Sequence, residues 1–150
     1  MATATANRPL IPALGKIYPQ AEEWGYLLLR VVAGLMLLTH VWPKLMSGPA
    51  AVAANVMARR GLEPALLNAY LVIGAEVLGA ICITIGLFTR VVALILIIEF
   101  LVIVKVHSAA GWGASVGGAE FPFLWLIVYV YILLRGGGRY SVDHKLGWEV

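Results

Sequence analysis

Long apolar segments alternate with short polar ones along this chain, and this pattern predicts its secondary structure. Four segments, at about residues 24–45, 65–88, 90–106 and 121–135, consist almost entirely of apolar residues. A helix of about 20 residues crosses the roughly 30 Å apolar core of a bilayer, and these segments reach or approach that length. We therefore predict an all-α, polytopic membrane protein whose four transmembrane helices form a bundle.

Polar stretches between the apolar segments set the domain organisation. Residues 1–23 contain three prolines and no apolar core of signal-peptide length, so we expect an N-terminal surface segment. Arg59 and Arg60 keep the connection between the first two spans out of the apolar core. Residues 136–150 are expected to form a C-terminal tail. Four spans and short connections use up 150 residues, which predicts a single membrane domain over residues 1–150.

Composition and charge support this class and exclude others. The chain is 61% hydrophobic and 13% charged, whereas soluble domains average about 45–50% apolar and 25% charged. The net charge of +3 is small, and the basic residues lie near span ends, so we predict no nucleic-acid partner. The single cysteine, Cys82, cannot form an internal disulfide, so thiol chemistry would belong to a partner protein.

The even number of predicted spans places both termini on one side of the membrane. Lys and Arg residues are more numerous on that side than on the other. The positive-inside bias therefore predicts that both termini are cytoplasmic.

Two acidic residues, Glu76 and Glu99, lie inside apolar spans. A charged side chain at the bilayer centre costs about 2.5–3.5 kcal/mol on insertion scales, so each needs a partner, a proton or water. Counted from the turn near Thr89, the two lie at similar depths, and if they face each other they would share one proton. The structural alternatives are a buried protonated carboxyl at Glu99 and an ion pair of Glu76 with Arg30 or His40.

Other polar residues near the span ends extend this set to a candidate ligand or proton pocket. Its members are Arg30, His40, Lys44, Glu76, Glu99, His107 and Glu120. At the membrane face opposite the termini, a glycine-rich loop that could admit a ligand lies beside His40, Lys44, Lys105, His107 and Glu120. Because histidine titrates near neutral pH, such a pocket should change its ligand affinity between about pH 5 and 8. The alternative is a solvated rim whose charges only set topology.

A metal or haem site is disfavoured. His40 and His107 could hold one from opposite helices, but there is no His-x-x-x-His, Glu-x-x-His or haem-attachment cysteine pair. Aromatic residues near the span ends are expected mostly to form an interfacial belt, although one or two could face a quinone ring. These residues are Trp42, Trp112, Trp125, Tyr129 and Tyr131.

Several short motifs occur in an order that resembles the DoxX family of membrane proteins. The motifs are Leu29-Arg30, Thr39-His40-Val41-Trp42-Pro43-Lys44-Leu45, Gly74-Ala75-Glu76, Ile85-Gly86-Leu87-Phe88-Thr89-Arg90, His107 and Gly136-Gly137-Gly138-Arg139-Tyr140-Ser141-Val142-Asp143. The chain departs from the family at Val41, where glycine usually follows the histidine, and Glu99 matches no family position.

The resemblance implies a bacterial-type inner (plasma) membrane protein of four helices, related to the small membrane subunit of thiosulfate:quinone oxidoreductase. One hypothesis is a quinone-interacting subunit in which His40, Glu76 and His107 shape a polar pocket. The chain has no flavin or nucleotide motif, so electrons would come from other protein subunits or a small reductant. The alternative is a non-catalytic membrane anchor or assembly partner for a redox or stress-response complex.

Overall fold

The computed structural model describes residue 11, residues 15–113, residue 115 and residues 117–148. All regular secondary structure in this part of the chain is helical, which confirms the predicted all-α class. The elements are α2 (Tyr18–Ser47), α3 (Pro49–Val52), a π-helical turn η1 (Ala53–Met57), a 3-10 turn η2 (Ala58–Arg60), α4 (Ala65–Ile85), α5 (Thr89–Ser108), α6 (Glu120–Arg135) and α7 (Val142–Leu146).

Three of these helices are long and apolar enough to cross a membrane. They are α2, α4 and α5, with 30, 21 and 20 residues. The fourth predicted span corresponds to α6, which has 16 residues and is therefore only about 24 Å long at 1.5 Å per residue. Among the described residues, three of the four predicted spans thus reach transmembrane length, which fits a multi-pass membrane protein.

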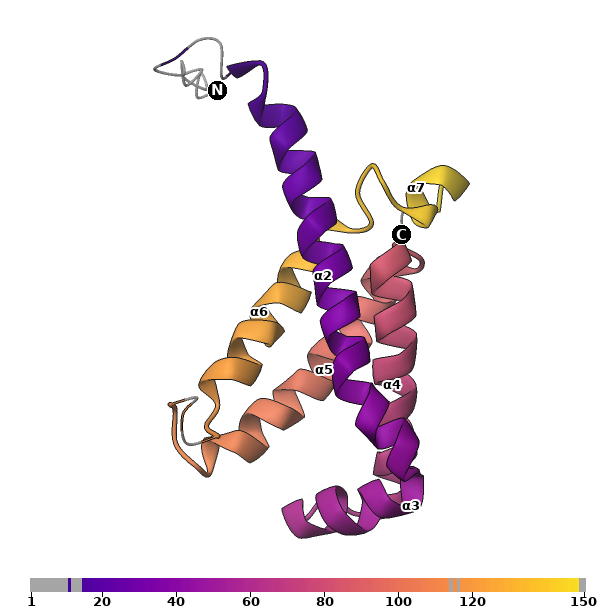
Figure 1. Ribbon diagram of the computed structural model, residues 1–150, viewed down its shortest axis with the longest axis vertical. Coiled ribbons are helices and arrows are strands. Elements are labelled where there is room, and N and C mark those ends of the chain that lie inside the picture. Colours follow the sequence, from indigo (N-terminus) through magenta and orange to yellow (C-terminus); the bar gives the residue numbers. More distant parts are fainter. Residues whose placement is uncertain (1–10, 12–14, 114, 116, 149–150) are drawn as a thin grey trace, which may run out of the picture.

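The long helices form two pairs (Figure 1). Helix α2 packs along α4, while α5 and α6 form an antiparallel hairpin that meets the first pair through α4 and α5. The start of α2 and helix α7 lie at one end of the molecule, which we call the tail end. Helix α3 lies at the opposite end, where α2 terminates, and we call this the α3 end.

Small residues bring the helices into close contact. A Cβ atom added at Gly34 would lie 2.8 Å from the backbone nitrogen of Thr84 and 2.9 Å from the carbonyl oxygen of Ala80, so α2 and α4 touch through their backbones. A Cβ at Gly79 would meet leucine side chains of α2 and α5 at 2.7 and 2.9 Å. Close approach of this kind is how helices associate in lipid, where water does not drive them together.

The buried apolar residues form two separate groups, and their positions show where the two helix pairs do not pack together. The larger group joins α2, α4, α5 and α6 and consists of Tyr26, Ala33, Leu37, Ala80, Ile83, Val92, Ala93, Leu96, Tyr129 and Ile132. The smaller group joins α2, α3, η1 and α4 at the α3 end and consists of Val41, Val52, Ala53, Met57, Ala69 and Ile73. Neither α5 nor α6 contributes a buried residue to the smaller group. The α5–α6 hairpin is therefore not packed onto α2 and α4 in this region.

Candidate functional site

A cavity of about 670 Å³ lies at the α3 end, between the two helix pairs. Its wall is mostly apolar, and residues of α2, η1, α4, α5 and α6 line it. The lining residues with charged, imidazole or amide side chains are His40, Lys44, Arg60, Asn68, Glu76, Glu99 and His107. Small-molecule sites in proteins are typically apolar clefts of about 300–1,000 Å³ with a few converging polar groups, and this cavity fits that description.

An ion pair between Lys44 and Glu76 lies in this cavity. Lys44 is in the last turn of α2, and its ammonium group donates to Oε1 of Glu76, which lies in the middle of α4. Glu76 is 3% exposed, and its second oxygen, Oε2, has no hydrogen-bond partner among the described residues. The ion pair therefore offsets the charge of the carboxylate but leaves one acceptor oxygen available.

Glu99 on α5 lies beside this pair. Its carboxyl group is close enough to Glu76 and Lys44 to interact with both electrostatically. It is 9% exposed, and neither of its oxygens has a hydrogen-bond partner in the described part of the chain. The two acidic residues predicted to lie at similar depths thus line one cavity, where they can share a proton. Three of their carboxyl oxygens have no N–H or hydroxyl donor among the described residues. Such unpaired buried polar atoms are rare in proteins and are typical of functional sites.

His40 and His107 line the same cavity. His40 is exposed and His107 is partly buried. Each Nδ1 atom lies 2.9 Å from a carbonyl oxygen of its own helix, that of Met36 for His40 and that of Ile103 for His107. The Nε2 atoms are left for other partners. Within the residues that the structure describes, no three His, Cys, Asp or Glu side chains converge as metal ligands would.

Aromatic side chains form one wall of the cavity. Phe121, Trp125 and Tyr129 follow one another at four-residue spacing on α6, which places them on one face of the helix. The rings of Trp125 and Tyr129 lie 6.1 Å apart, and Tyr129 lies 5.2 Å from Phe100 of α5. Tyr129 is 1% exposed, so it does not belong to the interfacial belt in which the sequence placed it.

Arg30 does not belong to this cavity. It is buried, and the alternative in which it pairs with Glu76 is wrong, because Lys44 takes that position. The guanidinium group of Arg30 instead donates to the carbonyl oxygens of Ile83 at 2.7 Å, Thr84 at 3.0 Å and Tyr140 at 2.9 Å. Arg30 therefore ties the C-terminal tail and the end of α4 to α2.

Asp143 completes the tail end, and the sequence analysis did not single it out as a site residue. Its carboxylate accepts hydrogen bonds from the backbone nitrogens of Phe88, at 2.7 Å, and Thr89, at 2.8 Å, and from the Thr89 hydroxyl at 2.7 Å. These are the unpaired donors at the start of α5, where negative charge is favourable. A Cβ at Gly86, whose φ is +72°, would lie 2.5 Å from the Arg30 guanidinium, so glycine is required there.

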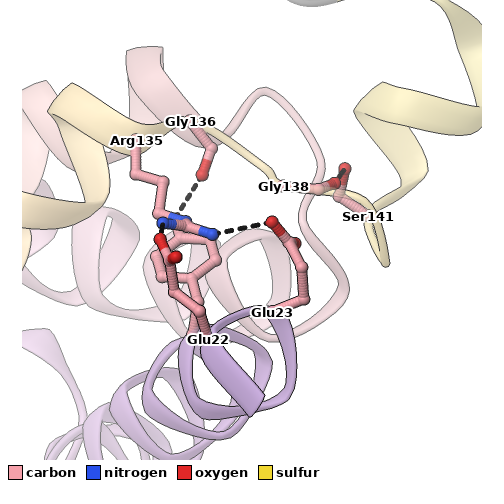
Figure 2. A network of polar contacts seen from close by, with 7 residues as sticks. Glu22, Glu23, Arg135, Gly136, Gly138 and Ser141 are labelled. Atoms are coloured by element: carbon pink, nitrogen blue, oxygen red, sulfur yellow. Dashed lines mark hydrogen bonds and ion pairs between the residues drawn. The ribbon is translucent and has the colours of Figure 1, made fainter. Parts of the chain in front are cut away.

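A surface network lies beside these buried groups. Figure 2 shows Arg135, the last residue of α6, between Glu22 and Glu23 of α2, with hydrogen-bond distances of 2.6 and 2.8 Å. The Arg135 guanidinium also lies 4.7 Å from the centre of the Tyr26 ring, and the Tyr26 hydroxyl donates to the Gly136 carbonyl oxygen. These contacts join the ends of α2 and α6.

The structure brings together five of the seven predicted site residues. His40, Lys44, Glu76, Glu99 and His107 line the cavity, whereas Arg30 lies at the tail end. Glu120 is the exposed first residue of α6 and is not among the lining residues. The sequence analysis missed the lining residues Arg60, which ends the 3-10 turn η2, and Asn68, which lies in the first turn of α4, because their positions near span ends suggested only surface residues.

These features define a multi-pass membrane protein whose helices surround an acidic, aromatic-walled cavity. The family model described as DoxX matches residues 25–109, more than half of the chain, and the chain belongs to the DoxX family. This match confirms the resemblance found in the sequence motifs.

Two relatives match most of the chain. An uncharacterized protein of Haemophilus influenzae is 29% identical over 121 residues, which cover 78% of this chain and 87% of the relative. A Bacillus subtilis protein with the name "Putative oxidoreductase CatD" is 29% identical over 124 residues, which cover 81% of this chain and 86% of the relative. No solved structure matches the chain.

Proposed function

We propose that this DoxX family protein is a quinone-interacting membrane subunit of a redox system and that its ligand binds in the cavity at the α3 end. The observation that carries the proposal is the Lys44–Glu76–Glu99 cluster, which places unpaired polar atoms deep in an otherwise apolar cavity. Quinones are flat rings with polar oxygens, and they dissolve in lipid. The apolar wall of the cavity suits the ring, and the unpaired polar atoms at its deep end suit the ring oxygens.

The aromatic wall and the charges support the same ligand class. Phe121, Trp125 and Tyr129 offer ring faces and edges against which a flat ring can pack. Carboxyl groups that exchange protons with a ligand can serve the proton transfers that accompany quinone reduction. The electrons come from a partner protein or a small reductant. The name of the Bacillus subtilis relative, which describes an oxidoreductase, supports a redox association.

In the membrane, we propose that α6 is the fourth span and that the chain crosses a bacterial inner membrane with both termini cytoplasmic. Short spans are accommodated by local thinning of the bilayer or by flanking residues. In a Cys82→Ala background, a cysteine in place of exposed Arg59 at the α3 end should react with an impermeant label from outside spheroplasts. A cysteine in place of exposed Lys145 at the tail end should not. Labelling of Lys145→Cys from outside would reject this orientation.

Ligand binding tests the functional proposal directly. The detergent-solubilised protein should bind a short-chain quinone or its reduced form saturably, and the ligand should quench tryptophan fluorescence because Trp125 lines the cavity. Glu76→Gln should weaken binding at least about tenfold, since it removes a charged group at the deep end. Glu22→Gln makes the same chemical change at the tail end and is the matched control.

The same experiment distinguishes the alternative of a membrane anchor. If neither the quinone nor its reduced form binds the wild-type protein, the polar groups are bundle contacts and the ligand-binding proposal fails. Equal binding by the Glu76→Gln and wild-type proteins would show that the ligand binds outside this cavity.

A further inference from the structure

We propose that the cavity selects the reduced, dihydroxy form of its aromatic ligand over the oxidised dione. This inference rests on the proposed function, because it concerns the same cavity and the same ligand class. It follows from a count of hydrogen-bond donors and acceptors at the deep end. A hydroquinone offers two O–H donors, whereas a quinone offers carbonyl oxygens that only accept.

The deep carboxyl groups are acceptors that lack donors. Oε2 of Glu76 and both oxygens of Glu99 have no N–H or hydroxyl donor among the described residues, although the two carboxyl groups lie close enough to share a proton. Both side chains are more than nine-tenths buried, at 3% and 9% exposed. An ionised carboxylate only accepts hydrogen bonds, so a ligand that approaches these oxygens must bring donors. If the two carboxyl groups share one proton, that proton forms a hydrogen bond between them. At least one of the deep carboxyl oxygens then still has no hydrogen-bond donor.

The two histidines add acceptors. A carbonyl oxygen only accepts hydrogen bonds, so the Nδ1 atoms of His40 and His107 are the donors in their contacts with Met36 and Ile103. In a neutral imidazole the other nitrogen, Nε2, then carries no proton and acts as an acceptor. Both imidazoles of the cavity lining are thus set by their own helices to accept hydrogen bonds from a ligand.

Donors also line the cavity, because Lys44 keeps two N–H groups beyond the one on Glu76 and Trp125 carries an indole N–H. Arg60 is exposed, and the Asn68 amide nitrogen donates to the Pro64 carbonyl oxygen. Lys44 uses one N–H on Glu76, and its side chain is 26% exposed. The Tyr129 hydroxyl can accept as well as donate. A dione could accept from these groups but would leave the deep carboxyl oxygens without donors, while a dihydroxy ring would supply what those oxygens lack.

Three matched probes test this selectivity in the wild-type protein. They are a decyl-substituted hydroquinone, the corresponding quinone and the hydroquinone dimethyl ether, which keeps the ring and chain but has no O–H. Binding is measured under anaerobic conditions in one detergent, with correction for partition into micelles. We expect the dissociation constant of the hydroquinone to be at least about tenfold lower than those of the quinone and the ether.

A charge-neutral variant sharpens the test. Glu99→Gln replaces one acceptor oxygen by an amide nitrogen that donates, so the hydroquinone should bind about tenfold more weakly while the quinone binds equally or more tightly. Glu22→Gln should keep the wild-type preference. Equal or tighter binding of the quinone or the ether to the wild-type protein overturns the selectivity but leaves the proposed function standing. Absence of binding by all three probes overturns both.

Discussion

The two ends of this molecule treat buried charge in opposite ways. At the tail end, Arg30 donates to three carbonyl oxygens, and Asp143 accepts three hydrogen bonds from the start of α5. At the α3 end, Lys44 pairs with one oxygen of Glu76, while the other Glu76 oxygen and the whole Glu99 carboxyl group have no partner in the described structure. The tail-end charges are thus held by several hydrogen bonds, although Nε of Arg30 and Nε of Arg90 have no partner among the described residues. The carboxyl oxygens at the α3 end lack such donors.

This difference separates structural from ligand-binding roles among residues of the same chemical type. A buried charge that hydrogen-bonds to several segments of the chain fixes the segments that it joins, and removing it leaves several groups unsatisfied. A buried charge without them weakens the fold and can be satisfied by a ligand. Substitutions at the tail end should therefore lower stability, whereas substitutions in the cavity should lower ligand binding.

The largest effect is expected for Arg30→Leu. The substitution leaves the carbonyl oxygens of Ile83, Thr84 and Tyr140 without the donor that they have now, at about 1–3 kcal/mol for each buried group. We expect a loss of about 3 kcal/mol or more, measured as thermal unfolding in detergent. Arg139→Leu changes an exposed arginine next to Tyr140 at the tail end and is the control. An unchanged melting temperature for Arg30→Leu would remove the contrast between the two ends.

Asp143→Asn should have the next largest effect. The amide keeps the shape of the side chain, but its nitrogen cannot accept the hydrogen bonds that Phe88 and Thr89 donate. Loss of a cap together with its charge should reduce the free energy of unfolding by about 2 kcal/mol. Lys145→Gln, two residues away and exposed, should have little effect in the same unfolding experiment. Equal effects of the two substitutions would show that Asp143 does not hold the tail in place.

Glu99→Leu should separate stability from binding. It removes a buried carboxyl group that has no N–H or hydroxyl donor among the described residues, and this relieves a desolvation penalty of about 1–3 kcal/mol. We expect a melting temperature equal to or above that of the wild type, together with loss of hydroquinone binding. Destabilisation as large as that of Arg30→Leu would mean that Glu99 is a structural contact, and the distinction between the two ends would fail.

Much of the fold could be predicted from the sequence, because apolar segment length directly reports the helices of a membrane protein. The predicted span at about 65–88 corresponds to α4 and the span at about 90–106 to α5. The first helix is longer than its apolar segment, since it begins at Tyr18, where Pro19 suits a first helical turn. The cavity could not be predicted, because it depends on how far the α5–α6 hairpin stands from α2 and α4.

The candidate site could be predicted in part. Glu76 and Glu99 stand out because acidic residues are rare in apolar spans. The alternative ion pair of Glu76 named Arg30 or His40, because the sequence does not show which side chain of the first span meets Glu76, whereas the fold places Lys44 beside it. Asp143 follows a glycine run and gives no sign of its role, since the helix that it caps begins 54 residues earlier in the chain.

The smallest effect is expected for Glu22→Gln. This substitution tests whether the contrast between the two ends is limited to buried charges. Glu22 lies at the tail end, but its side chain is 67% exposed, and Arg135 would keep its contacts with Glu23 and the Tyr26 ring. Exposed ion pairs contribute about 0–1 kcal/mol and are screened by salt. We expect a loss below about 0.5 kcal/mol that disappears when unfolding is measured in high salt. A loss that is larger, or that persists in high salt, would show that stability at the tail end depends on the surface network as well as on Arg30 and Asp143.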